Sequence, residues 1–203
     1  MKKQLSFLAI ACAMLLTGNV MAQFNINGGI SAMNTKDNVN NSDTTIGYYV
    51  GVTNNFELTS HIGIAPGVYF RSLKNDNEYD KLKETYTENS VNVPVLLNLN
   101  LNISEQSRAY IFAGPEFNIG ISAKQKIVTT GDKPETMSEQ NYFDADDIIR
   151  LNRFNISGTV GIGLKLDFMN FNIGLSSTLL DRRASKDIEE KGYSAFIGLG
   201  LVF

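Results

Sequence analysis

The sequence predicts an all-β fold, an eight-stranded antiparallel up-and-down transmembrane β-barrel. Residues 154–168 give the clearest signal. From Phe154 onward every second residue but one is large and apolar, and the residues between them are polar or glycine. A period of two places these two sets on opposite faces of a strand. The run is about twice the usual length of a globular strand, and its pattern is typical of a wall between lipid and a polar lumen.

The same alternation recurs along the chain and predicts about eight strands. They are expected at residues 24–32, 45–56, 61–72, 91–102, 109–121, 154–168, 169–176 and 192–203. A tilted transmembrane strand needs about 9–11 residues, and these segments have 8 to 15. Pro66 lies within the third segment. Because proline disfavours a paired strand, we expect a β-bulge there.

The connections between the segments alternate between long and short. The expected long loops are residues 34–44, 74–88, 124–150 and 181–191, and the expected short turns are residues 57–60, 104–107 and 167–170. Antiparallel strands joined in sequence place the long loops at one end and the short turns at the other. In outer-membrane barrels the long loops are extracellular and the short turns periplasmic. An even strand count returns the C-terminus to the periplasmic side.

Residues 1–22 are predicted to be a cleaved secretory signal peptide. Lys2 and Lys3 give a positive start, and residues 5–16 are apolar but too short to span a membrane. Val20-Met21-Ala22 places small residues at the −3 and −1 positions, so we expect cleavage after Ala22. Residues 23–203 then form the barrel domain. The alternative is an uncleaved anchor helix.

Cysteine content and charge exclude several classes of protein. Cys12 lies within the predicted signal peptide, so the mature chain would have no disulfide or thiol chemistry. Lipid modification of Cys12 is a weaker alternative, because Ala9 rather than leucine lies three residues before it. Removing Lys2 and Lys3 from the 18 basic residues leaves 16 against 21 acidic ones, a net charge of −5. The protein is therefore not expected to bind nucleic acid.

A soluble barrel of the lipocalin kind is the alternative fold, since such barrels also often have about eight strands. In that fold the apolar set would line the interior and the polar set would face water. Here the polar set is mostly Asn, Ser, Gly and Thr, and the apolar set is bulky and uninterrupted. The pattern therefore favours a lipid-facing apolar surface, and a closed sheet also satisfies every backbone group inside a membrane.

Four segments carry a resemblance to a known family: Ser90–Leu97, Tyr110–Glu116, Gly161–Leu164 and the terminal Phe203. They resemble the outer-membrane β-barrel "porin family" (PorT-like) proteins and, more loosely, the small OmpA/OmpX-type barrels. The resemblance implies a location in the cell outer membrane of a Gram-negative bacterium, in contact with lipid and lipopolysaccharide. It also implies that the strand ending at Phe203 is recognised by the barrel-assembly machinery.

An eight-stranded barrel is just wide enough to be filled by its own side chains. We therefore expect a filled lumen without a substantial open pore. The residues expected to form a hydrogen-bonded ion network inside it are Arg71, Glu116, Lys165 and Asp167, with Tyr69, Tyr110 and Asn98. A proton path or a ligand path is the alternative use of these side chains.

No catalytic, cofactor-binding or metal-binding residue is predicted. Small outer-membrane barrels that modify lipid A usually need Ser with His at the outer rim. The single histidine, His61, is expected beside a short turn at the periplasmic end, away from the outer leaflet. Asp144, Asp146 and Asp147 could bind calcium, but they lack the Gly and distal Glu of a calcium loop, which favours a solvated acidic loop.

The expected function is that of a non-enzymatic outer-membrane barrel with a filled lumen and extracellular loops. Envelope structure, adhesion or a secretion-accessory role would suit such a protein. A narrow transport or ligand-binding barrel is the alternative, and a lipid-modifying enzyme is a third. Basic residues in the expected loops could contact lipopolysaccharide phosphates: Lys124, Lys126, Arg182 and Arg183.

Overall fold

The computed structural model describes residues 22–38, 42–79, 82–104, 106–129, 136–145, 150–185 and 189–203. The predicted signal peptide lies outside the described residues, apart from Ala22. The nine strands are β1 (Ala22–Asp37), β2 (Ser42–Glu57), β3 (Ile62–Tyr79), β4 (Leu82–Asn102), β5 (Ser107–Thr129), β6 (Thr136–Asn141), β7 (Phe154–Leu166), β8 (Met169–Thr178) and β9 (Glu190–Val202). No helix in this described part is long and apolar enough to cross a membrane.

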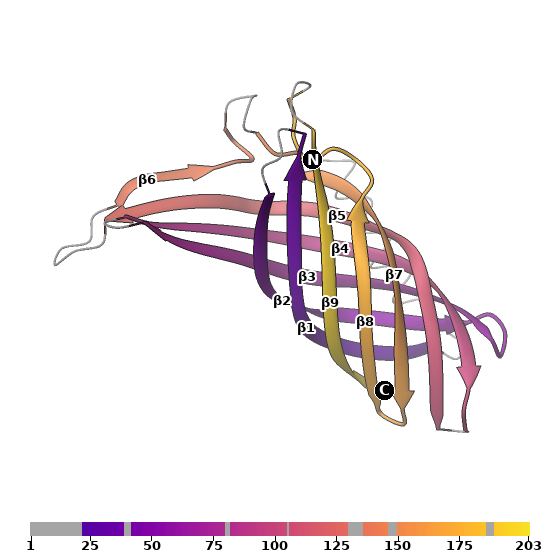
Figure 1. The fold of residues 1–203 in the computed structure, drawn as a ribbon. Coiled ribbons are helices and arrows are strands. Elements are labelled where there is room, and N and C mark those ends of the chain that lie inside the picture. Colours follow the sequence, from indigo (N-terminus) through magenta and orange to yellow (C-terminus); the bar gives the residue numbers. More distant parts are fainter. Residues whose placement is uncertain are drawn as a thin grey trace.

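The strands form one closed antiparallel ring (Figure 1). Their order is β4-β3-β2-β1-β9-β8-β7-β5-β6, and an additional pairing of β4 with β5 closes the sheet. Strand β6 pairs with β5 alone and lies outside the ring, which leaves eight strands in the barrel. The predicted fold class is therefore confirmed, with one extra strand that the sequence pattern did not indicate.

The predicted inward and outward faces are confirmed. Ile30 and Leu175 on the apolar parity are 60% and 61% exposed, whereas Asn27 and Thr159 on the polar parity are 3% and 4% exposed. The barrel thus has an apolar outer band and a polar interior, the arrangement that lipid requires. The soluble alternative needs the reverse arrangement and is excluded for this fold.

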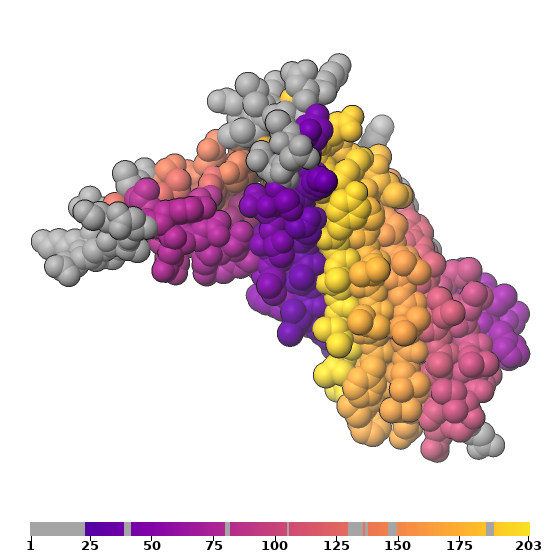
Figure 2. All heavy atoms as spheres, in the orientation of Figure 1, coloured from indigo at the N-terminus to yellow at the C-terminus, as the bar shows by residue number. Residues whose placement is uncertain are grey.

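The expected long loop 74–88 is instead largely strand, because β3 continues to Tyr79 and β4 begins at Leu82. The expected long loop 124–150 begins as strand, because β5 continues to Thr129, and it also contains β6. These ends, together with β6, form a four-stranded sheet that runs past the barrel (Figures 1 and 2). We call this part, residues 73–79, 82–88, 122–129 and 136–141, the extension sheet. The backbones of these segments pair with one another beyond the barrel, so their polar composition does not make them irregular.

The expected bulge at Pro66 is not present. The pairing of β2 with β3 joins Thr53 to Gly67 and Phe56 to Ile64 without a shift in register. On the other side Pro66 pairs with Val95, also in an unshifted register. A few residue pairs near Pro66 are missing from these ladders, but the register is the same before and after the proline. The inward and outward faces of β3 are therefore the same on both sides of Pro66.

Candidate functional site: the lumen and the cap over its outer end

Five aromatic rings form a continuous group inside the barrel. The ring centroids lie 5.5 Å apart for Tyr49 and Tyr69, and 6.0 Å apart for Tyr49 and Phe196. The group continues from Phe196 to Phe112 at 6.3 Å and from Phe112 to Tyr110 at 6.0 Å. Strands β2, β3, β5 and β9 contribute these rings, so the group joins opposite walls of the lumen.

Glycines on the facing strands make room for these rings. A Cβ atom at Gly161 would overlap the ring of Phe112, and one at Gly163 would overlap the ring of Tyr110. These are the residues with which the two aromatics pair in the β5–β7 register. The glycines on the inner face of residues 154–168 therefore leave the space into which the aromatic rings of β5 pack. Sequence analysis missed this match, because it depends on the register between the two strands.

The predicted polar network is present in part, as separate groups and not as one network. Arg71 lies 3.9 Å from Glu116, which also accepts a hydrogen bond from Asn92 at 3.0 Å. The other predicted residues make hydrogen bonds to different partners. The Tyr110 hydroxyl donates to Asn170 at 2.8 Å, and Asn98 donates to Asn55 at 3.0 Å. Lys165 donates to Gln23 at 2.6 Å, and the Tyr69 hydroxyl accepts from Asn27 at 3.4 Å. The lumen is therefore filled by both aromatic and polar side chains.

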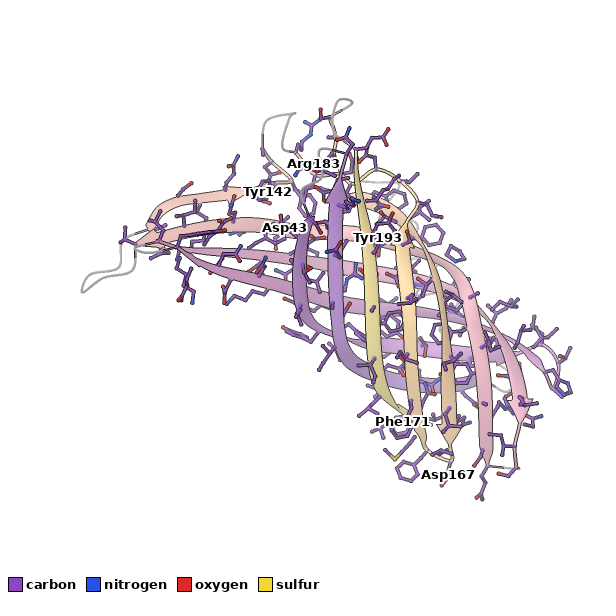
Figure 3. The ribbon with its side chains drawn as sticks, in the orientation of Figure 1. Asp43, Tyr142, Asp167, Phe171, Arg183 and Tyr193 are labelled. Carbon is purple, nitrogen blue, oxygen red and sulfur yellow. The ribbon has the colours of Figure 1, made fainter. Side chains whose placement is uncertain are left out.

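Asp167 was wrongly placed in the lumen. It lies in the turn between β7 and β8, exposed, with a φ of 51° (Figure 3). Strand β7 ends at Leu166, so the alternation that points Lys165 inward does not continue to Asp167. The left-handed backbone of the tight turn directs the side chain away from the lumen. Short-chain Asp tolerates that conformation better than most residues.

Two cavities remain inside the barrel. The larger, about 120 Å³, reaches from the short-turn end, where Gln23 and Lys165 line it, up to Arg71. The smaller, about 30 Å³, lies on the other side of Arg71, below Phe143 and Arg182. Arg71 lines both, so its pair with Glu116 lies between them. The described residues thus form a lumen that is closed toward the long-loop end.

The described residues of two connections, 142–145 with 150–153 and 179–185, cover the long-loop end of the barrel, and we call them the cap. The cap packs around a small core of its own. Ala123, Phe143 and Leu151 are buried together, and Tyr86 and Tyr142 pack against them. Leu151 also pairs with Arg183 in an antiparallel bridge. The connection between β6 and β7 and the connection between β8 and β9 are therefore joined above the barrel, where loops were predicted.

A buried ion cluster fixes the cap to the barrel wall. Arg182, 8% exposed, donates to Glu88 of β4 at 2.8 Å and to Glu190 of β9 at 3.0 Å. Burial opposes the charged form of Glu88, yet the Arg182 guanidinium overrides it and holds the pKa of Glu88 below its usual value. These carboxylates likewise raise the pKa of Arg182 against the effect of its burial. Arg182 is thus occupied inside the protein and unavailable to lipopolysaccharide.

We expect the cap to loosen in acid. Because the pKa of Glu88 is lowered in the folded state, its contribution to stability is complete above the ordinary glutamate pKa of about 4.3. That contribution is lost as the pH falls through the lowered value. Amide hydrogen exchange of residues 181–185, corrected for its intrinsic pH dependence, should rise at that step. A Glu88→Gln variant should exchange faster at neutral pH and show no step.

Of the acidic residues for which a solvated loop was favoured over a calcium site, only Asp144 lies within the described residues. Asp144 accepts a hydrogen bond from Arg153 at 2.7 Å and another from Asn141 at 2.7 Å. Asp146 and Asp147 lie outside the described residues. Among the residues described, no group of three or more His, Cys, Asp or Glu side chains could hold a metal ion.

His61 lies at the short-turn end, as predicted. It is exposed in the turn between β2 and β3, with Nδ1 2.8 Å from the Ser60 hydroxyl. The pair consists of neighbouring residues on a solvent-exposed turn. Lys124 and Lys126, in contrast, are exposed on the extension sheet near the opposite end, so their contact with lipopolysaccharide stays a prediction.

A closed antiparallel sheet with an apolar outer band and a polar, filled interior defines a transmembrane β-barrel. The model of the family described as "Outer membrane protein beta-barrel domain" matches residues 17–179, and the chain belongs to this family. Family membership implies that the protein is located in the outer membrane. Comparison with curated protein sequences gives no match.

Solved structures share the fold at low sequence identity. Ail, the attachment invasion locus protein of Yersinia pestis, is 14% identical with a TM-score of 0.51, covering 90% of this chain and 99% of Ail. The complex of Ail with the heparin analogue sucrose octasulfate gives 12% identity, a TM-score of 0.53 and the same coverage. Neisserial surface protein A is 8% identical with a TM-score of 0.48, covering 89% and 97%. These identities show the fold alone.

Proposed function

We propose that the protein is a non-enzymatic outer-membrane barrel that displays the cap and the extension sheet at the cell surface for adhesion. Envelope structure and a secretion-accessory role are the related possibilities. The extension sheet is the observation that carries this proposal. It is built from strands that continue directly from the barrel wall (Figure 1), so it projects past the barrel as a paired sheet.

The composition of the extension sheet supports a recognition role. Tyr79 is 59% exposed and Leu82 is 38% exposed, and the two residues pair at the tip of the β3–β4 hairpin. Glu78 and Lys83 also pair near this tip, 3.6 Å apart. An exposed aromatic and an exposed aliphatic side chain in a charged setting suit contact with another surface.

The test compares whole cells that carry the full chain with cells that carry a shortened hairpin. Residues 77–84 are replaced by Asn-Gly, which favours a two-residue hairpin turn. We expect adherence to fall to the level of cells lacking the protein, with the barrel still folded by heat-modifiable gel mobility. Immobilised heparin is a suitable first surface, because the similar Ail barrel binds a heparin analogue.

The matched control exchanges charges without removing the hairpin. Glu78→Lys combined with Lys83→Glu keeps the ion pair and the exposed Tyr79, so adherence should persist. A Lys126→Cys variant should react with a membrane-impermeant thiol reagent on intact cells, because Lys126 is exposed on the extension sheet. Unchanged adherence after hairpin removal would refute the adhesive role, and reaction of this cysteine only in lysed cells would refute the surface location of the sheet.

His61→Ala is expected to change neither barrel folding nor the lipid A composition of the cells. The side chain is exposed at the short-turn end, where its Nδ1 lies within hydrogen-bond distance of the adjacent Ser60 hydroxyl. Mass spectrometry of extracted lipid A from cells with and without the variant checks this. A difference that depends on His61 would show an enzyme and would overturn both the proposed function and the orientation.

A further inference from the structure

The larger cavity has an unusual combination of charge and apolar surface. Three cations line it, Arg71, Arg108 and Lys165, against one carboxylate, Glu116. Its walls also include apolar side chains: Ala65, Leu96, Phe112 and Phe196. A pocket with apolar walls and a few placed polar groups is the usual form of a small-molecule site.

Lys165 differs from the other two cations in its partners. Arg71 lies near Glu116, and Arg108 forms an ion pair with Glu57. The hydrogen bond that Lys165 makes in the described structure is to the neutral side-chain amide of Gln23, at 2.6 Å. Glu57 and Asp167 act on Lys165 electrostatically, but no ion pair joins either of them to it among the described residues. A partly buried ammonium group gains from direct contact with a carboxylate, which a bound anion would supply.

The surrounding groups define the size and character of this anion. An apolar cavity of about 150 Å³ holds benzene, so a cavity of about 120 Å³ admits a molecule of only a few carbon atoms. Asn100 also lines the cavity, 7% exposed, and its amide nitrogen has no hydrogen-bond partner among the described residues. That nitrogen is a donor suited to a second carboxylate oxygen.

We propose that the short-turn half of the lumen binds a small aliphatic carboxylate. Its carboxylate group pairs with Lys165 near the mouth, and its hydrocarbon chain lies deeper, against Leu96 and Phe112. Lys165 and Phe112 follow one another up the lumen, since Lys165 pairs with Arg108 and Phe112 with Gly161 in the same register. The ligand enters from the short-turn end, because the cap closes the other.

Butyrate is the probe, with 1-butanol and butylamine as matched neutral and cationic analogues. Saturation-transfer NMR on the refolded full-length barrel in detergent should show transfer to butyrate and at least tenfold weaker binding of both analogues. Lys165→Met should weaken butyrate binding at least tenfold, the effect of losing one charge-assisted hydrogen bond. Lys36→Met, an exposed lysine of β1 at the long-loop end, should leave binding unchanged.

A second variant keeps the charge and removes the space. Ala65→Leu fills the cavity wall while retaining Lys165, and it should also abolish the butyrate signal with the barrel still folded by gel mobility. Equal binding of butyrate and 1-butanol, or butyrate binding that survives both variants, would overturn the proposal. Absence of any butyrate signal with the folded parent protein would overturn it as well.

Discussion

Gly161→Ala is expected to destabilise the barrel by about 1–3 kcal/mol, the usual cost of overpacking a filled interior. The new Cβ would overlap the Phe112 ring and the carbonyl oxygen of Ile173, and it would lie 2.8 Å from Gly174 Cα. Backbone atoms of β8 cannot move aside without breaking the β7–β8 ladder. The urea midpoint of the heat-modifiable gel shift, measured in a fixed lipid or detergent, checks this result.

Gly158→Ala provides the matched control on the same strand. Gly158 is on the outer parity, and its nearest neighbour for a new Cβ is Leu179 Cδ2 at 3.8 Å, an ordinary contact. This variant should therefore unfold at the parent midpoint or slightly above it, because alanine restricts the unfolded chain more than glycine. Equal midpoints for the two variants would contradict the tight packing of β7 against the aromatic rings.

Arg182→Ala is expected to cost about 3–5 kcal/mol of cap stability, since it leaves the buried Glu88 carboxylate without its ion-pair partner. Arg182 is 8% exposed and binds both Glu88 and Glu190. Limited proteolysis of residues 181–185 and their hydrogen exchange should both accelerate, with the barrel strands still protected. Arg183→Ala should have a smaller effect, because the Arg183 side chain is more exposed than that of Arg182 and its loss leaves Arg182 paired with both carboxylates.

Replacing the whole cluster distinguishes charge from packing. Arg182→Met combined with Glu88→Gln and Glu190→Gln removes the buried charges together, and it should recover most of the lost stability. If Arg182→Ala left the cap as protected as in the parent protein, the ion cluster would not be what holds the cap. If the triple variant were as unstable as Arg182→Ala, packing of the Arg182 side chain would explain the loss.

The barrel wall could be predicted from sequence because lipid imposes a binary pattern on it. Ile30 and Leu175 had to be apolar and Asn27 polar, whatever their neighbours were. The extension sheet could not be predicted in this way. Residues 75–78 are Asn, Asp, Asn and Glu, so both faces are polar and the period of two is invisible. Water on both sides removes the signal, although the backbone pairing continues.

Sequence could predict that the interior is polar, but not which side chains contact one another there. That Lys165 and Arg71 point inward follows from alternation, but their partners depend on the register between strands. The cluster at the cap is a stronger example. Arg182 and Glu88 lie 94 residues apart, and no local pattern links an arginine in a loop to a glutamate on another strand. Asp167 was misplaced for a related reason: alternation does not show where a strand ends.

Planar-bilayer recording of the refolded full-length protein tests the central claim, that this is a closed outer-membrane barrel. Aromatic rings and the Arg71–Glu116 pair fill the lumen, and the cap covers its long-loop end. The structure therefore predicts insertion, shown by the heat-modifiable form in the same lipid, without steady single-channel conductance. Steady channels of uniform size from the inserted parent protein would contradict it.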